Sequence, residues 1–428
     1  MNPEELDVWE EPVLATCATW RRQAIYTPNF WRWIYVRQTT GLEEIALCLS
    51  RSKPVLLNVT IECRRDNNPS LEIPMPHYNM MESFLEHFSG RIVSLTLLGL
   101  RPLEWMPIKL LKTPSIRMLW CGYAHYDECK GDDPPESMLS EAKLPNLHRL
   151  ELTGGRVEHV HLASPNFASL LHVRLNAVVC FDTAWKIFIQ CSQLESIFWQ
   201  ADGKWESDWE YRTPAYYGLE RPFLPKLKVL DLEEAAVALF LPSADFPNIE
   251  VLGLHSPHET PALSDILPHL SNEEKSRVRT LNLQNITNLS KEDLLVTLSF
   301  PSLEQLSSDS WGPDTLRVLK CLNEFHVNGQ HQKVWKCPRL RKLDIGFDST
   351  FKSTDIKPGE TSDALEQTLK ALVSKRARGR EGALRINVED IQLKLPCHED
   401  AAHWSSITVA GRALEHMSDG KQENRVVA

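Results

Sequence analysis

Cysteine and histidine are the side chains whose possible chemistry is easiest to judge from spacing. A zinc site uses such residues as ligands, and two groups of them stand close together along the chain. These groups are Cys121, His125 and Cys129, whose four-residue intervals one helical face could share, and Cys397, His398 and His403. Neither group has a nearby fourth ligand, so we expect no metal site. The ten cysteines also lack the paired spacing of disulfide frameworks, which favours reduced thiols.

Motifs for catalysis are not found in the sequence. No segment resembles a phosphate-binding glycine loop, the helix of a zinc protease or a Gly-x-Ser-x-Gly elbow. We therefore predict that the protein is not an enzyme and that it uses no cofactor.

Composition and charge narrow the possible partners. The 428 residues have a net charge of -10, and 42% are hydrophobic, which is typical of a folded chain. The acidic balance argues against nucleic acid, because a phosphate backbone needs a concentrated positive face. The N-terminus has no signal-peptide pattern, and no stretch is apolar for long enough to span a membrane. We expect a protein of the cytoplasm, the nucleus or both, without a membrane partner.

A six-residue pattern, apolar-x-x-apolar-x-apolar, organises most of the chain. It is clearest in the segments that start at Leu147, Leu227, Ile249 and Leu340. Weaker copies start at Leu56, Ile92, Ile116, Leu170, Leu194, Val278, Leu303 and Leu322. The dozen copies recur at a mean spacing of roughly 26 residues, which indicates a repeat protein.

Proline stands two residues before the first apolar position in half of these copies. The prolines are Pro114, Pro145, Pro225, Pro247, Pro301 and Pro338. Proline fits the turn before a strand and disrupts a strand interior, so the pattern predicts a turn followed by a strand. Side chains alternate along a strand; the fourth and sixth positions should therefore point into the core and the third, fifth and seventh to the opposite face.

Segments with helical spacing lie between the predicted strands. Phe181 to Cys191 has an apolar stripe with Asp182 as its expected N-cap, and Ser290 to Leu298 begins like a capping box. Similar spacing occurs from His77 to Phe88 and from Thr361 to Ser374. The alternation of strand and helix predicts an α/β fold built as a repeat solenoid.

The repeated unit resembles the leucine-rich-repeat family from about Lys53 to Phe347. The resemblance implies an irregular, ribonuclease-inhibitor-like horseshoe that binds another protein. The family's usual asparagine or cysteine at the ninth position is replaced here by other residues. These are Gly155, Ala235, Pro257, Ile286 and Asp348.

The residues before the repeats resemble the second half of an F-box. Leu42 to Ser50 also resembles the helix that leads into the repeats of fungal F-box proteins. The F-box match is carried by Cys17, Trp20, Arg21, Ala24, Pro28 and Trp31. Only sixteen residues precede Cys17, too few for the family's opening helix, so we expect a truncated F-box. The resemblance implies that these residues bind the Skp-type adaptor of a cullin-RING ubiquitin ligase. The alternative is that the tryptophans, including Trp33, only cover the first repeat.

Outward strand positions and one aromatic insert are the candidate partner-binding residues. The strand positions are mixed in charge, which suits a protein partner. They include Arg149, Glu151, His172, Arg174, Ser196, Phe198, Asp231, Glu233, His255, Thr280, Asn282, Lys342 and Asp344. The insert, residues 200–222, contributes Trp205, Trp209 and Tyr211, which either bind a partner or pack on a neighbouring helix. A second insert, residues 123–141, is acidic.

Four regions summarise the expected organisation. They are a partial F-box-like helical segment (1–40), a helical entry with the first repeat (41–90), irregular leucine-rich repeats (91–395) and a flexible C-terminal tail (396–428). The function implied is a substrate-recognition subunit of an SCF-type ubiquitin ligase that binds an unknown protein substrate. The alternative is a stand-alone repeat scaffold that binds a protein without a ligase.

Overall fold

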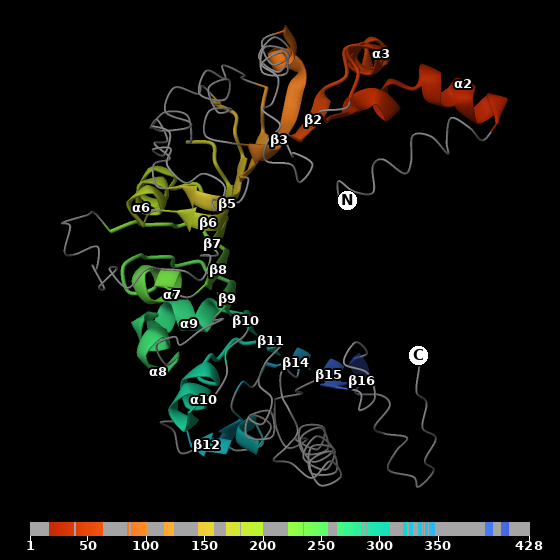
Figure 1. The fold of residues 1–428 in the computed structure, drawn as a ribbon. Helices are drawn as coiled ribbons and strands as arrows, with labels where there is room; N and C mark the ends of the chain where they lie inside the picture. Colours follow the sequence, from red (N-terminus) through yellow and green to blue (C-terminus); the bar gives the residue numbers. More distant parts are fainter. Residues whose placement is uncertain are drawn as a thin grey trace, which may run out of the picture. The chain divides into compact units, whose positions relative to one another are not determined.

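The computed structural model shows a mixed α/β protein built around parallel strands (Figure 1). It describes residues 17–37, 40–62, 84, 87–100, 115–123, 144–157, 168–179, 181–199, 221–233, 235–255, 263–284, 286, 290–308, 320–322, 325–327, 333–335, 337, 339–340, 342–346, 390–396 and 404–410. The chain divides into two compact units, residues 1–194 and residues 195–428, which we call unit 1 and unit 2.

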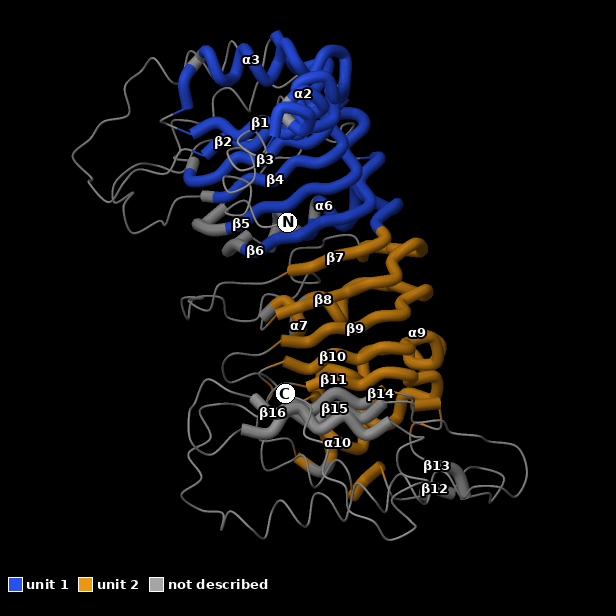
Figure 2. The backbone as a smooth tube through the Cα atoms, turned by 90° about the vertical axis from the view of Figure 1, so that its right-hand side faces the viewer, with its two compact units in different colours: residues 1–194 blue, residues 195–428 orange. Residues whose placement is uncertain are grey.

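Unit 1 contains six strands that pair in parallel and in chain order (Figure 2). The strands are β1 (Trp33–Val36), β2 (Leu57–Glu62), β3 (Ile92–Leu100), β4 (Met118–Tyr123), β5 (Arg149–Val157) and β6 (His172–Val179). Its helices are α2 (Ala18–Tyr26), η2 (Pro28–Arg32), α3 (Leu42–Ser52), η3 (Ser89–Arg91) and α6 (Phe181–Gln190).

Unit 2 continues with the same strand arrangement. Strands β7 to β11 pair in parallel, β14 pairs with β11, and β15 pairs with β14. The bounds are β7 (Ser196–Trp199), β8 (Val229–Glu233), β9 (Val251–His255), β10 (Thr280–Gln284), β11 (Gln305–Ser308), β14 (Lys342–Gly346) and β15 (Asp390–Pro396). Its helices α7 (Ala235–Phe240), α8 (Leu263–Ile266), η8 (Leu267–His269), α9 (Asn272–Arg277) and α10 (Lys291–Thr297) lie on one side of the strands (Figure 1).

The inward and outward alternation expected from the hexamer is present in both units. Leu150 and Leu152 of β5, and Leu230 and Leu232 of β8, have no exposed surface, whereas the positions between them are partly exposed. Burying a leucine side chain is worth about 1.5–3 kcal/mol, so the stacked leucines supply the main stabilising contribution.

A proline turn leads into several strands. The N–H of Leu227 donates to Leu224 O at 3.2 Å, and the N–H of Ile249 donates to Phe246 O at 3.2 Å, with proline second in each turn. Proline's fixed φ suits this position. Leu224 and Phe246, which begin the two turns, are fully buried. Each turn is therefore held in the core at its first residue, and its hydrogen bond fixes the start of the following strand.

Two capping boxes of unit 2 make additional contacts to the segment that precedes them. The carboxylate of Asp293 accepts from the N–H of Ser290 at 2.9 Å and from the N–H of Ser264 at 2.7 Å. Glu274 accepts from the N–H groups of Ser271 and Phe246 at 2.8 and 3.2 Å. Each acid thus completes its own helix start and also ties the helix to the preceding repeat.

Several sequence predictions can be compared with these elements. The helices expected at Leu42–Ser50, Phe181–Cys191 and Ser290–Leu298 are confirmed as α3, α6 and α10. Helix α6 begins at Phe181, so Asp182 lies inside the helix and is not its N-cap. The expected helix at Thr361–Ser374 lies outside the described residues. Of His77–Phe88, only Phe84, His87 and Phe88 are described, and these are helical.

Two segments form other structures than the sequence predicted. Residues 33–36 form strand β1 and are not helical, which agrees with the alternating burial of Trp33-Ile-Tyr-Val. The repeat predicted at Leu322 does not belong to the parallel sheet. Its strand β12 (Phe325–Val327) pairs antiparallel with β13 (Lys333–Trp335), because β14 occupies the edge of β11. In the segment expected to be a flexible tail, β16 (Trp404–Ala410) pairs antiparallel with β15.

Candidate functional site

The F-box-like residues form a helix followed by a tight turn. Trp31 Nε1 donates to Ala24 O at 2.7 Å, and both side chains are buried. The guanidinium of Arg51 lies 4.4 Å from the centre of the Trp31 ring, which fixes the turn against α3. Cys17 caps α2, with its sulfur accepting from the N–H of Trp20 at 3.5 Å. Ala24, Pro28 and Trp31 thus build the scaffold of this segment.

Large aromatic side chains project from this anchored segment into solvent. Trp20 is 58% exposed, Tyr26 71%, Phe30 57% and Trp33 47%. Arg21 lies in α2, but its side chain is outside the described part of the chain. Of the three tryptophans, only Trp31 has the buried position expected of a cover for the first repeat. Exposed tryptophan and tyrosine on a rigid support are typical of protein interfaces.

The outward strand positions of unit 1 form a charged cluster on β5 and β6. Glu151 Oε2 lies 3.2 Å from Arg149 Nη2, and Glu151 Oε1 lies 3.6 Å from Arg174 Nε. Arg174 also donates to Asn176 Oδ1 at 3.2 Å. Trp120 on the neighbouring strand β4 and His172 on β6 also occupy outward positions. Both arginine side chains remain more than two-fifths exposed, so a partner can reach them.

The outward positions of unit 2 bring together an aromatic ring, a carboxylate and an imidazole. Asp231 Oδ1 lies 2.5 Å from His255 Nε2, an ion pair when the imidazole is protonated. The Phe198 ring meets His255 edge-on at 6.2 Å between centroids. Gly253 makes this possible, because a Cβ at residue 253 would lie 2.5 Å from Asp231 Oδ1. The three predicted residues Phe198, Asp231 and His255 therefore form one cluster.

Other predicted positions behave differently. Glu233 was expected at the solvent-exposed face but is only 7% exposed, beside His255 on the next strand. Ser196, Thr280 and Lys342 are partly exposed as expected, and Asn282 accepts from the hydroxyl of Ser307 at 2.7 Å. The side chain of Asp344 and the insert residues Trp205, Trp209 and Tyr211 lie outside the described residues, as does the acidic insert.

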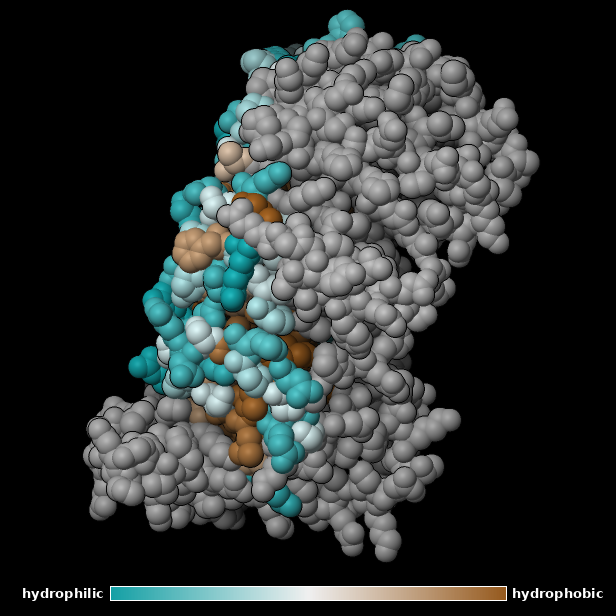
Figure 3. Space-filling view, turned by 90° about the vertical axis from the view of Figure 1, so that its left-hand side faces the viewer, coloured by the Kyte–Doolittle hydropathy of each residue, from teal (hydrophilic) through white to brown (hydrophobic). Residues whose placement is uncertain are grey.

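The helical side of the molecule offers a different surface. Figure 3 views the side on which the unit 2 helices lie, and the described residues visible there are mostly hydrophilic. Hydrophobic residues occur in small separate areas in this view. The exposed aromatic and charged groups of the N-terminal segment and the strand faces are therefore the stronger binding candidates.

Thiol chemistry has poor support in the described residues. Cys121 lies in strand β4, not on a helix, and burial raises the pKa of its thiol. Burial also raises the pKa of Cys191 to about 12. A thiol is nucleophilic as the thiolate, so neither is suited to catalysis near neutral pH. Among the residues that the structure describes, no group of three potential ligands could hold a metal ion.

Sequence reasoning missed a groove at the turns of unit 2. The groove has a volume of about 700 Å³, and the turns and strand starts of successive repeats contribute to it. Its cations are Lys226, Lys228, Arg277, Arg279 and Arg339. The signal was present as basic residues on either side of the first apolar position, as in Lys226-Leu-Lys228 and Arg277-Val-Arg279.

Comparison with known proteins does not identify a relative. No family model matches the chain, and no curated protein matches it. None of the helices in the described residues is both long enough and apolar enough to cross a membrane.

Proposed function

We propose that the protein is a leucine-rich-repeat adaptor that binds other proteins, and that it acts as a substrate-recognition subunit of an SCF-type ubiquitin ligase. Two observations support the repeat assignment: the proline turns and the buried leucines recur before and along successive parallel strands. Such a repeat array holds an extended face for a partner while its core is kept by neighbour-to-neighbour packing.

The observation that carries the adaptor role is the exposed aromatic group on the N-terminal segment. Trp20 and Tyr26 project from helix α2. Trp31 fixes the following turn to this helix through a buried hydrogen bond to Ala24 O. Exposing two such rings has no benefit for folding, whereas rigid aromatic side chains lose little entropy when they meet a partner. We assign this segment to the Skp-type adaptor and the outward strand positions to the substrate.

Binding to a purified Skp-type adaptor tests the proposal. We expect the full chain to bind in isothermal titration calorimetry, and the double variant Trp20→Ala/Tyr26→Ala to bind at least about ten-fold more weakly. Phe223→Ala is the matched control, because Phe223 is an aromatic residue of unit 2 with 59% exposure. Circular dichroism melting of each variant separates lost binding from lost folding.

Two results would contradict the ligase role. The wild-type chain could fail to bind the adaptor, or the Trp20/Tyr26 variant could bind as tightly as wild type. Failure of the wild type favours the second candidate, a stand-alone scaffold that uses only its strand faces. The clusters around Glu151 and Asp231 support this second function, because neither depends on the N-terminal segment.

A further inference from the structure

The turn groove of unit 2 has a regular distribution of charge. Each repeat places one residue just before the first buried apolar position, and we call this set the outer row. From β8 to β14 the outer row reads Lys226, Asn248, Arg277, Ser302 and Arg339. Positive and neutral side chains therefore alternate, and the row contains no acid. The three cations belong to β8, β10 and β14, which are separated by single strands in the sheet.

An inner row lies two residues further along each repeat, at the start of the strand. From β7 to β11 it reads Glu195, Lys228, Glu250, Arg279 and Glu304, and backbone hydrogen bonds connect these residues in sequence at 2.7 to 2.9 Å. Opposite charges thus stand next to each other along this row. The residues that line the groove carry a positive excess, because five of them are cations and two, Glu195 and Glu250, are acids.

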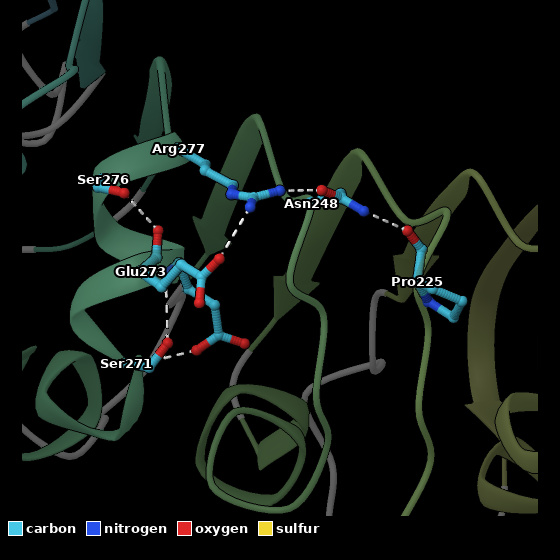
Figure 4. Close-up of polar contacts among 7 residues, drawn as sticks. Pro225, Asn248, Ser271, Glu273, Ser276 and Arg277 are labelled. Carbon is cyan, nitrogen blue, oxygen red and sulfur yellow. Dashed lines mark hydrogen bonds and ion pairs between the residues drawn. The ribbon is translucent and has the colours of Figure 1, made fainter.

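The centre of the outer row is held in place by polar contacts (Figure 4). Arg277 donates to Asn248 Oδ1, and Asn248 Nδ2 donates to Pro225 O at 2.6 Å. Glu273 Oε1 pairs with Arg277 Nη2 at 2.8 Å and offsets part of its charge. The other four cations are exposed and have no carboxylate within ion-pair distance among the residues described here. The groove thus combines one positioned arginine with four cations available to a ligand.

The spacing of the outer-row cations suggests the form of the ligand. Adjacent strands of a sheet lie about 4.8 Å apart, so cations on every second strand recur at roughly 9.6 Å. A polyproline II segment rises about 3.1 Å per residue, and every third residue returns to the same side after about 9.3 Å. A peptide with an acidic residue at every third position would therefore match Lys226, Arg277 and Arg339 in turn.

We propose that this groove binds an acidic, extended peptide segment of a partner protein. The carboxylates of the inner row favour a peptide over nucleic acid, since they would repel a continuous phosphate chain but can pair with basic residues of a peptide. This inference does not depend on the ligase role, because none of its residues belongs to the N-terminal segment.

Fluorescence anisotropy with a labelled peptide of five Glu-Pro-Pro repeats tests the proposal on the full chain. We expect saturable binding that weakens as salt is added, because exposed ion pairs are screened. A peptide of the same composition, with its five glutamates in one block, should bind several-fold more weakly. Lys226→Glu/Arg339→Glu should reduce the affinity for the repeated peptide at least about ten-fold, since it replaces two attractions with repulsions.

The control variant is Arg22→Glu/Arg117→Glu, which makes the same change in net charge at two exposed positions of unit 1. It should bind the peptide as wild type does. Equal affinity for both peptides would overturn the proposed spacing. No binding by the wild type, or equal losses in both variants, would overturn the site. If a 15-nucleotide oligothymidine competes as well as the peptide, the groove is a general polyanion site and the peptide assignment is wrong.

Discussion

The outward faces of units 1 and 2 carry the same short succession of side chains with one difference. In unit 1, Trp120, Glu151 and Arg174 stand in register on β4, β5 and β6. In unit 2, Phe198, Asp231 and Gly253 stand in register on β7, β8 and β9. Each set begins with an aromatic residue and continues with an acid.

The third residue of each set, Arg174 or Gly253, determines which cationic or imidazole side chain the acid contacts. In unit 1 the in-register neighbour of Glu151 is Arg174, so the charge is balanced directly across the strand pair. In unit 2 the neighbour of Asp231 is Gly253, and the carboxylate extends over the glycine to His255. A missing side chain thus changes a direct pair into a diagonal one. The arginines of the unit 1 cluster are 48% and 41% exposed and stay open to a partner, whereas the His255 and Asp231 side chains are 11% and 22% exposed.

The largest expected effect concerns a carboxylate that unit 2 uses internally. Burial would raise the pKa of Asp293, but hydrogen bonds from Ser290 and Ser264 outweigh burial and lower it from its ordinary value of 3.8. The Asp293 carboxylate therefore stabilises the folded state fully above the unfolded-state pKa. This stabilisation is lost as the pH falls through the lower folded-state pKa. Asp293→Asn should reduce the unfolding free energy by about 2 kcal/mol at neutral pH, from the lost cap and charged hydrogen bonds.

Urea unfolding of wild type and Asp293→Asn at several pH values measures this effect. The difference between the two proteins should begin to shrink as the pH falls below about 4, the ordinary range of the unfolded-state carboxyl, and continue to shrink through the lower folded-state pKa. The control is Glu292→Gln, which changes an acid in the same first turn of α10. Its unfolding free energy should differ little from that of wild type at each pH. A difference between wild type and Asp293→Asn that does not vary with pH would show that the ionised carboxylate is not responsible.

A smaller effect should distinguish the two faces directly. Gly253→Ala places a Cβ 2.5 Å from Asp231 Oδ1, whereas at Gly122 the nearest atoms, on Leu98 and Thr153, would lie 3.2 Å away. We expect Gly253→Ala to cost about 1–2 kcal/mol and Gly122→Ala less than about 1 kcal/mol, because overpacking costs depend on how far neighbours can move.

Combining Gly253→Ala with Asp231→Ala identifies the cause. If the cost comes from displacing the Asp231 carboxylate, Gly253→Ala should be nearly neutral once Asp231 is alanine. Hydrogen exchange of the β9 backbone, compared with that of β4, locates the effect within unit 2. Purely additive substitutions would mean that the carboxylate does not explain the requirement for glycine.

The smallest expected effect belongs to the open cluster of unit 1. Glu151→Gln removes contacts to Arg149 and Arg174, but both arginine side chains are more than two-fifths exposed, so the loss in unfolding free energy should stay below about 1 kcal/mol. Thermal unfolding at low and high salt is the measurement, and high salt should reduce the difference between variant and wild type. A loss above about 2 kcal/mol would indicate that Glu151 has a structural role and not one in an accessible binding face.

Much of the local structure follows from the sequence alone. The hexamer correctly located strands β2 to β11 and β14 with their buried leucines, because alternation along a strand depends only on neighbouring residues. Proline before the first apolar position correctly indicated turns, since proline restricts its own φ and lacks a donor. The same local logic identified the capping box at Ser290 and Asp293. The F-box-like residues predicted a helix and turn, and that part is also observed in α2 and η2.

Contacts between repeats required the tertiary structure, because they depend on register and on which strands are neighbours. The hexamer at Leu322 resembled the others, yet β14 occupies the edge that its strand would need. The link from Arg277 through Asn248 to Pro225 joins residues more than twenty positions apart, as does the contact of Asp231 with His255. Sequence therefore determined which residues point inward or outward, whereas tertiary packing decided which outward residues meet.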